Sequence, residues 1–159
     1  MIDFRSYFTE LFEKPYAVRE LRRLGHGITT AEITYQAKTE NGKYLIIDIT
    51  KINHRGWEIN FTIDGSHDLT HAGKPFRVFA TVIEAARMFL KDHLDAWGEL
   101  PQQLDMISKT SESKREAVYT SLMRRFGKQY GYRITNRSVT GSEWGPDNAR
   151  TLVTATLSS

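Results

Sequence analysis

The stretch Phe76–Tyr132 constrains the fold of this 159-residue chain more than any other part, because a long helical pattern, a short strand and a second helical pattern follow one another there. Gly98 and Pro101 end the first pattern, as expected for a left-handed C-terminal residue followed by a helix breaker. Its apolar side chains recur at i+3 and i+4, which predicts an amphipathic helix: Phe79, Val82, Ile83, Ala86, Phe89, Leu90, His93 and Trp97.

The second helical pattern follows a short strand candidate at 103–107. Ser113 is its predicted N-cap, and Glu116 three residues later completes a capping box. The pattern stops at Gly131, which supplies the left-handed conformation that ends many helices. Residues 132–135 and 152–157 are rich in β-formers and predict two closing strands.

The N-terminal half predicts a short helix followed by a three-stranded meander. Phe4, Phe8, Leu11 and Phe12 have helical spacing, and residues 15–30 are interpreted as a loop. Residues 33–38, 44–49 and 57–63 read as strands, with a type I′ turn at Asn41-Gly42 between the first two.

These elements predict an α+β fold, with a mostly antiparallel central sheet of about six strands, two main helices and a short N-terminal helix. The whole chain, 1–159, is expected to form a single domain. It would comprise an N-terminal helix and loop (1–30), a core (31–139) and a C-terminal loop and strand (140–159).

Composition excludes several functional classes. The chain has no cysteine, which rules out disulfides, thiolate catalysis and cysteine metal sites. Its apolar runs are shorter than the ~18 residues of a membrane span, and its start lacks the pattern of a signal peptide. We therefore expect intracellular synthesis without export.

Charge is unevenly distributed along the chain. The net charge is +3, but residues 109–137 alone carry +6, and the rest of the chain is negative. Such a stretch could attract nucleic acid, or it could be a solvated helix face. Its eight cations are Lys109, Lys114, Arg115, Arg124, Arg125, Lys128, Arg133 and Arg137.

The polar loop 64–75 is the first place where chemistry could occur. It contains His67, Asp68 and His71, but Gly73 and Pro75 argue against the helix that would let the two imidazoles bind one metal. We interpret it as a polar loop and predict no metal site.

Arg115 has two interpretations. It falls within the apolar arc of the second helix and in its first turn, where free backbone N–H groups favour an anion. It could anchor an anion at the edge of the sheet. Alternatively, it forms a structural pair with an acid such as Asp105, or extends its stem over the core.

Tyr119 and Glu58 are the candidate acid and base. Tyr119, one turn after Arg115, could protonate a thiolate leaving group, or it could be a core tyrosine whose hydroxyl reaches water. Glu58 could be a general base if it faced a cleft, or an ordinary exposed strand residue.

The order of elements over residues 31–139 resembles the GNAT acetyltransferases. In that family, loop amides and a helix N-terminus hold the acetyl-CoA pyrophosphate, a tyrosine of the later helix protonates the thiolate, and a strand glutamate serves as base. The resemblance implies these roles for Gly73, Tyr119 and Glu58, and makes Lys74, Phe76, Arg77 and Arg115 candidates for contact with the cofactor. The family's loop motif requires Gln or Arg three residues before the glycine and Gly or Ala two after it, where this chain has Thr70 and Pro75.

Three sequence blocks also resemble a family of small tailed-bacteriophage proteins without established activity. They are 11–16 (Leu-Phe-Glu-Lys-Pro-Tyr), 76–82 (Phe-Arg-Val-Phe-Ala-Thr-Val), and Lys114-Arg115 with Val118-Tyr119 followed by Tyr130-Gly131-Tyr132. Before the second block such proteins typically read Thr-Gly-x-Gly-Asp-Ala, whereas this chain reads Leu-Thr-His-Ala-Gly-Lys-Pro at 69–75. The resemblance implies a phage-encoded protein with a GNAT-like core.

The sequence thus supports three hypotheses. The first is a phage accessory or virion-associated protein that uses a GNAT-like scaffold for binding without a cofactor. It would act in the host cytoplasm or in the virion, with phage or host proteins or further copies of itself as partners. The second is an acetyl-CoA-dependent N-acetyltransferase using Tyr119 and Glu58. The third is a nucleic-acid-binding protein using the 109–137 stretch.

Overall fold

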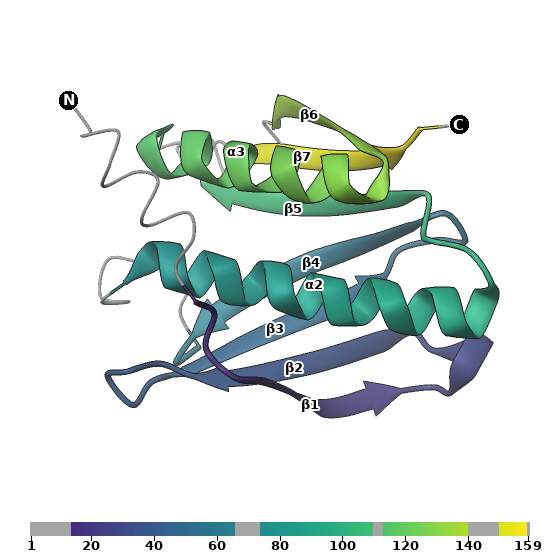
Figure 1. Cartoon of the computed structure of the whole chain (residues 1–159), viewed down its shortest axis with the longest axis horizontal. Helices are drawn as coiled ribbons and strands as arrows, with labels where there is room; N and C mark the ends of the chain where they lie inside the picture. The colour runs from purple at the N-terminus through teal and green to yellow at the C-terminus, as the bar shows by residue number, and fades with distance from the viewer. Residues whose placement is uncertain (1–13, 66–73, 110–112, 140–149, 159) are drawn as a thin grey trace. The chain divides into compact units, whose positions relative to one another are not determined.

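A computed structural model describes residues 14–65, 74–109, 113–139 and 150–158. It shows a mixed sheet of seven strands in the order β1-β2-β3-β4-β5-β7-β6, with two helices (Figure 1). The predicted α+β class is therefore correct, with one strand more than expected. The predicted N-terminal helix falls outside the described residues.

The chain divides into two compact units. Unit 1 comprises Met1–Thr50 and Asn60–Glu99, and unit 2 comprises Lys51–Ile59 and Leu100–Ser159. Strand β4 (Gly56–Ile63) contributes to both. Unit 1 further contains β1 (Val18–Leu24), the 3₁₀ helix η1 (Gly27–Thr29), β2 (Glu32–Lys38), β3 (Tyr44–Lys51) and α2 (Pro75–Trp97).

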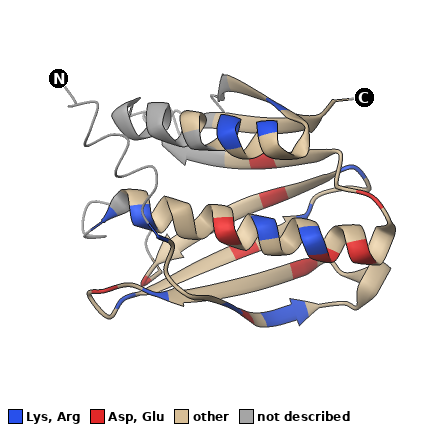
Figure 2. Cartoon of the chain, viewed as in Figure 1, with Lys and Arg blue, Asp and Glu red and all other residues tan. Residues whose placement is uncertain are grey.

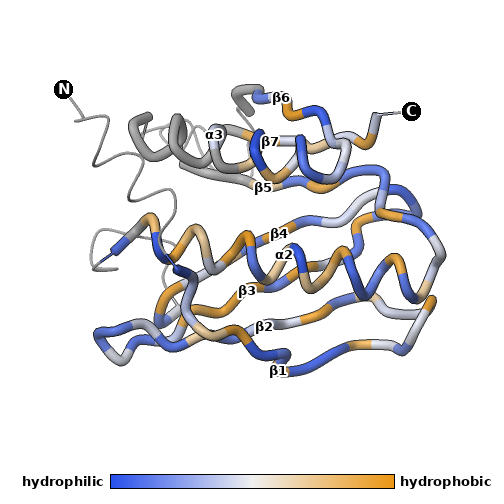
Figure 3. Tube along the Cα trace, viewed as in Figure 1, coloured by the Kyte–Doolittle hydropathy of each residue, from blue (hydrophilic) through white to orange (hydrophobic). Residues whose placement is uncertain are grey.

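Strands β2 and β3 form the predicted hairpin, and their alternation of apolar and polar positions is visible in Figure 3. The turn differs from the prediction. Gly42 has a φ of 74°, but Asp64 is the one described non-glycine residue with positive φ, so Asn41 does not adopt the type I′ conformation. A five-residue loop closed by Thr39 and Lys43 replaces the predicted two-residue turn.

One face of this hairpin forms part of the core of unit 1, and α2 runs across it (Figure 1). Phe61 of β4 meets Phe79 of α2 edge to face, with ring centroids 6.5 Å apart. Helix α2 ends as predicted, because Gly98 adopts a φ of 75° and its N–H donates to the Leu94 carbonyl. Six buried side chains form three cross-strand pairs on this face: Ile33–Ile49, Tyr35–Ile47 and Ala37–Leu45.

The prediction of a loop for residues 15–30 is wrong for Val18–Leu24, which form β1 at the edge of the sheet. The register with β2 shifts between Glu20 and Arg22, so a β-bulge breaks the alternation that would have revealed the strand. The bulge has a consequence for packing. Arg23 is paired with the core residue Ile33, and its guanidinium donates to both oxygens of Asp92 on α2, at 2.9 and 3.1 Å.

Unit 2 contains the first half of β4, β5 (Gln103–Lys109), α3 (Ser113–Tyr130), β6 (Tyr132–Val139) and β7 (Arg150–Leu157). Strands β4 and β5 are parallel and pair over Gly56–Ile59 and Gln103–Met106. Strand β7 is antiparallel to both β5 and β6 and lies between them. The predicted strands and the second helix are confirmed.

Gly127 determines how closely α3 approaches β6. A Cβ at this position would lie 2.9 Å from the Tyr132 carbonyl oxygen and 2.9 Å from Ile134 Cδ1. A second contact fixes the same face, because Asn136 Nδ2 donates to Thr120 Oγ1 at 2.8 Å. Ile134 and Asn136 therefore mark the face of the sheet on which α3 packs. Since side chains alternate along a strand, Arg133 and Thr135 lie on the other face.

Candidate functional site

The connection from β4 to α2 begins with a strained turn in unit 1. Asp64 has a φ of 49° and Gly65 a φ of 80°. Asp64 is held in this sparsely populated region by two hydrogen bonds to Tyr44. Its N–H donates to the Tyr44 carbonyl at 2.9 Å, and its carboxylate accepts from the Tyr44 N–H at 2.8 Å. The strand end that leads into the predicted cofactor loop is thus rigidly anchored. Gly73, the predicted loop glycine, lies outside the described residues.

The N-terminus of α2 is suited to an anion. Lys74 is the N-cap residue and makes no side-chain cap, and the first turn contains no acid. Pro75 has no N–H, and the first helical hydrogen bond runs from Val78 N–H to the Lys74 carbonyl at 3.1 Å. The N–H groups of Phe76 and Arg77 precede it and have no partner within the helix. Two amides at the positive end of the helix dipole, beside a lysine, fit a phosphate.

The side chains at this helix end differ in what they contact. Lys74 Nζ lies 3.7 Å from Glu40 of the β2–β3 hairpin, and Phe76 is half-buried. Arg77 Nε donates to the Lys14 carbonyl at 2.9 Å, and the guanidinium lies 4.0 Å from the Tyr16 ring centroid. The Tyr16 N–H in turn donates to Thr81. Arg77 therefore holds the segment before β1 against α2, a contact for which the sequence carried no signal.

The first candidate catalytic residue, Glu58, belongs to unit 2. It is half-buried in β4, and its register partner in β5 is Asp105. Asp105 accepts two hydrogen bonds of 3.1 Å from Gln103 Nε2. Thr154 of β7 and Thr135 of β6 continue the same row. Two carboxylates at paired positions favour a cation between them, such as an ammonium group. The sequence could not reveal this pair, because the parallel register is set by the fold.

The row that contains Glu58 is on the face of the strands away from α3. Ile134, which faces α3, has Ala155 as its register partner in β7, and the same row continues through Leu104 of β5 to Trp57 of β4. Glu58 is the next residue after Trp57, so its side chain is on the opposite face of the sheet. Arg115 and Tyr119 are at α3 positions whose side chains are not described. Asp105, proposed from sequence as a structural partner for Arg115, lies on the face opposite the helix and is bound by Gln103.

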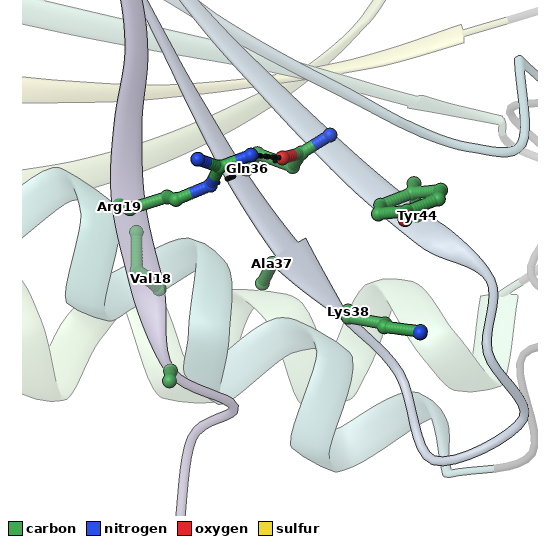
Figure 4. Close-up of a pocket in the computed structure, with 7 residues that line it drawn as sticks. Val18, Arg19, Gln36, Ala37, Lys38 and Tyr44 are labelled. Atoms are coloured by element: carbon green, nitrogen blue, oxygen red, sulfur yellow. Dashed lines mark hydrogen bonds between the residues drawn. The ribbon is translucent and has the colours of Figure 1, made fainter.

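A shallow depression of about 310 Å³ lies in unit 1, where the chain enters β1 (Figure 4). Arg19 reaches across to β2, and its Nε and one terminal nitrogen donate to Gln36 Oε1 at 3.2 and 2.6 Å. Lys38 Nζ lies 5.9 Å from the Tyr44 ring centroid. The hollow is lined by Ala17, Val18, Arg19, Gln36, Ala37, Lys38 and Tyr44, which include two cations and no acid.

The described cations of the basic stretch 109–137, which could attract nucleic acid, lie on two different faces of the sheet. Arg124, Arg125 and Lys128 of α3 are exposed. Figure 2 shows lysine and arginine positions of this helix in blue. Arg133 is also exposed, but it is on the opposite face of the sheet. These four cations therefore do not form one surface.

Two further predictions concern metals and membranes. Within the described ranges no group of three or more His, Asp or Glu side chains could hold a metal ion. His67, Asp68 and His71 are outside those ranges. No helix among the described residues is long and apolar enough to cross a membrane.

Similarity to known proteins is confined to structure. No protein-family model matches the sequence, and no curated protein matches it significantly. A spermidine N-acetyltransferase SpeG chimera from Vibrio cholerae and hSSAT is similar with a TM-score of 0.51 and 10% identity, over 91% of this chain and 95% of that chain. A GNAT family acetyltransferase from Elizabethkingia anophelis with acetyl-CoA bound has a TM-score of 0.49 and 13% identity, over 91% and 100%. The chain has a GNAT acetyltransferase-like fold, as predicted; at this identity the likeness shows the fold alone.

Proposed function

We propose that the chain is an acetyl-CoA-dependent N-acetyltransferase. The observation that carries the proposal is the N-terminus of α2, the next element after β4, with two amides that have no partner within the helix, a lysine at the N-cap and no acid in its first turn. The fold of the similar SpeG chimera supports it, since that protein is an acetyltransferase. This evidence favours the catalytic hypothesis over the binding-only hypothesis.

We assign the binding and proton-transfer roles to the following residues. Phe76 and Arg77 N–H groups and Lys74 Nζ would bind the cofactor's phosphates. Acetyl-CoA, when bound, supplies the activated thioester. Glu58 would accept the proton of an attacking amine. Tyr119 remains the proposed donor of a proton to the departing sulfur, although its helix packs on the sheet face opposite to Glu58. Gly73 and Arg115 remain proposed cofactor contacts.

An amine is the acceptor that fits best. Glu58 and Asp105 occupy paired positions, and together they could hold an ammonium group before one of them takes its proton. The SpeG chimera is a spermidine N-acetyltransferase, so spermidine is a suitable first test substrate.

The experiment is a steady-state assay of CoA release with spermidine and other amines. Because the chain has no cysteine, a thiol reagent detects only the released CoA. Glu58→Gln should lower kcat/KM at least ~100-fold, the usual size of a lost general base, and Tyr119→Phe should lower kcat. The matched control is Glu84→Gln, which removes a partly exposed carboxylate from α2. Turnover that is equal in all variants would contradict the assigned roles.

A binding-only protein is the second candidate, and two features of the same helix end favour it. Pro75 removes one amide from the turn, and Arg77 is directed onto Tyr16 and Lys14. A folded chain that neither binds acetyl-CoA nor releases CoA in the presence of amines would select this function. The phage accessory or virion-associated role is a separate proposal, tested by mass spectrometry of purified particles. If the protein is absent from purified particles, the virion role is excluded.

A further inference from the structure

Helix α3 presents a positively charged outer side. Arg124, Arg125 and Lys128 are exposed, whereas Met123, Phe126 and Gly127 are buried on the side that packs on the sheet. Arg124 and Lys128 are four residues apart, so they lie above one another, about 6 Å apart along the helix axis. Close packing at Gly127 gives this side a rigid support.

Arg124 and Lys128 have no acid among their neighbours in the sequence. Residues 117–142 contain no Asp or Glu. Like charges at i and i+4 destabilise a helix by about 0.2–0.5 kcal/mol. The helix dipole favours Lys128, which is in the last turn, but Arg124 lies before that turn. Acids nearby in the sequence therefore do not offset this repulsion.

Helix α2 provides an internal comparison. Arg87 and Lys91 have the same order and spacing and are also exposed. Glu84 lies before this pair and binds Arg87 at 3.6 Å, and Asp95 follows Lys91 by four residues. The pair on α2 thus has an acid close to each cation in the sequence, whereas the pair on α3 has none within residues 117–142.

The chemistry of the α3 side favours a nucleic acid over a protein. Protein interfaces depend on buried apolar or aromatic anchors. Among the residues whose exposure is described, the exposed large apolar ones are Leu21, Leu24, Ile28, Tyr44, Ile52 and Leu94. None of these is in the part of α3 for which exposure is described, residues 120, 121 and 123–130. Arginine and lysine side chains supply what a phosphate backbone requires, namely charge and several N–H donors.

We propose that the outer side of α3 around Arg124 and Lys128 binds the phosphate backbone of nucleic acid. This site is independent of the acetyltransferase proposal. Two phosphate contacts give an expected slope of about −1.4 for log K against log salt concentration with a single strand. Arg133, on the other sheet face, does not contribute to it.

The test is fluorescence anisotropy of a labelled 20-nucleotide single strand with the intact chain, between 50 and 200 mM NaCl. The variant Arg124→Glu/Lys128→Glu should weaken binding at least tenfold and flatten the salt dependence. The matched control Arg87→Glu/Lys91→Glu makes the same charge change on α2 and should alter binding less than threefold. Arg133→Glu should also have little effect.

Three results would overturn the proposal. These are an equal loss in both double variants, which would show a response to net charge alone; a salt slope near zero; and competition by polyglutamate as strong as by unlabelled oligonucleotide. Arg124→Gln/Lys128→Gln serves as a second variant that leaves no new acid on the helix. Its circular dichroism spectrum, compared with that of the parent chain, separates lost binding from lost folding.

Discussion

The two helices carry the same arginine–lysine pair at the same spacing, in opposite surroundings. On α2, Arg87 and Lys91 stand between Glu84 and Asp95, and that helix is also fastened by polar contacts to Tyr16, Lys14 and Arg23. On α3, Arg124 and Lys128 have no acid nearby in the sequence. This difference is why we propose a ligand for the cations of α3 and none for those of α2.

Each helix is also anchored by a buried phenylalanine. Truncation of these side chains should give the largest changes in the free energy of unfolding. Phe79 of α2 is fully buried and Phe126 of α3 is 2% exposed. Each Phe→Ala change should lower the free energy of unfolding by about 3–5 kcal/mol, through lost burial and a cavity. Urea unfolding followed by circular dichroism measures it. A loss below about 1 kcal/mol at either site would mean that its helix is not seated as described.

A substitution at Gly127 tests the close approach of α3 to β6. Gly127→Val should lower the free energy of unfolding by about 1–3 kcal/mol, because the new atoms meet the Tyr132 carbonyl and the side chain of Ile134. Thermal unfolding of the variant gives the value. The control is Gln129→Val, which places the same side chain at an exposed position of the same helix. Equal effects at the two positions would refute close packing.

Two buried tyrosines, one in each unit, predict the response to alkaline pH. Burial raises the pKa of Tyr35 and of Tyr132 above the ordinary value of about 10. Above pH ~10 the unfolded chain loses these protons first, so the free energy of unfolding should fall as pH rises. Tyr132→Phe should cost about 1 kcal/mol at pH 7, because its hydroxyl donates to the Pro101 carbonyl.

The measurement is urea unfolding between pH 9 and 11. The Tyr132→Phe variant should lose stability with pH less steeply than the parent chain, by up to about 1.4 kcal/mol per pH unit. Parallel pH profiles for the two proteins would show that Tyr132 titrates normally when folded.

The smallest expected effect is the change in stability caused by a single charge reversal on each helix. Arg124→Glu should stabilise α3 by about 0.2–0.5 kcal/mol, since it replaces a repulsive pair with a glutamate four residues before Lys128. Arg87→Glu gains the same glutamate–lysine contact with Lys91 but loses the contact with Glu84 and places two glutamates three residues apart, so its net effect on stability should be close to zero. Paired thermal melts at low salt measure the difference, and equal stabilisation by both changes would remove the contrast between the helices.

Much of the fold was predictable because it depends on local patterns. The periodicity of residues 79–97, the glycines at 98 and 131, and the alternation in β2–β4 identify their elements correctly. Strand β1 was missed because its bulge breaks the alternation, and its exposed arginines resemble a loop. The prediction of a type I′ turn at Asn41-Gly42 was wrong, because hydrogen bonds between Thr39 and Lys43 close a longer loop.

The sequence proposed Lys74, Phe76 and Glu58 as site residues, and their roles stay predictions. The pairing of Glu58 with Asp105 left no signal in the sequence, because it depends on the parallel register of two distant segments. The contacts of Arg77 with Lys14 and Tyr16 join residues more than 60 positions apart. Such contacts depend on tertiary structure and leave no local pattern.

The central claim is that this fold binds acetyl-CoA at the N-terminus of α2. Calorimetric titration of the intact chain with acetyl-CoA tests it most directly, with Lys74→Glu as the variant and Lys43→Glu as the matched charge control. We expect saturable binding that Lys74→Glu weakens at least tenfold and Lys43→Glu leaves within twofold. No binding to the parent chain, or equal weakening by both changes, would contradict the claim.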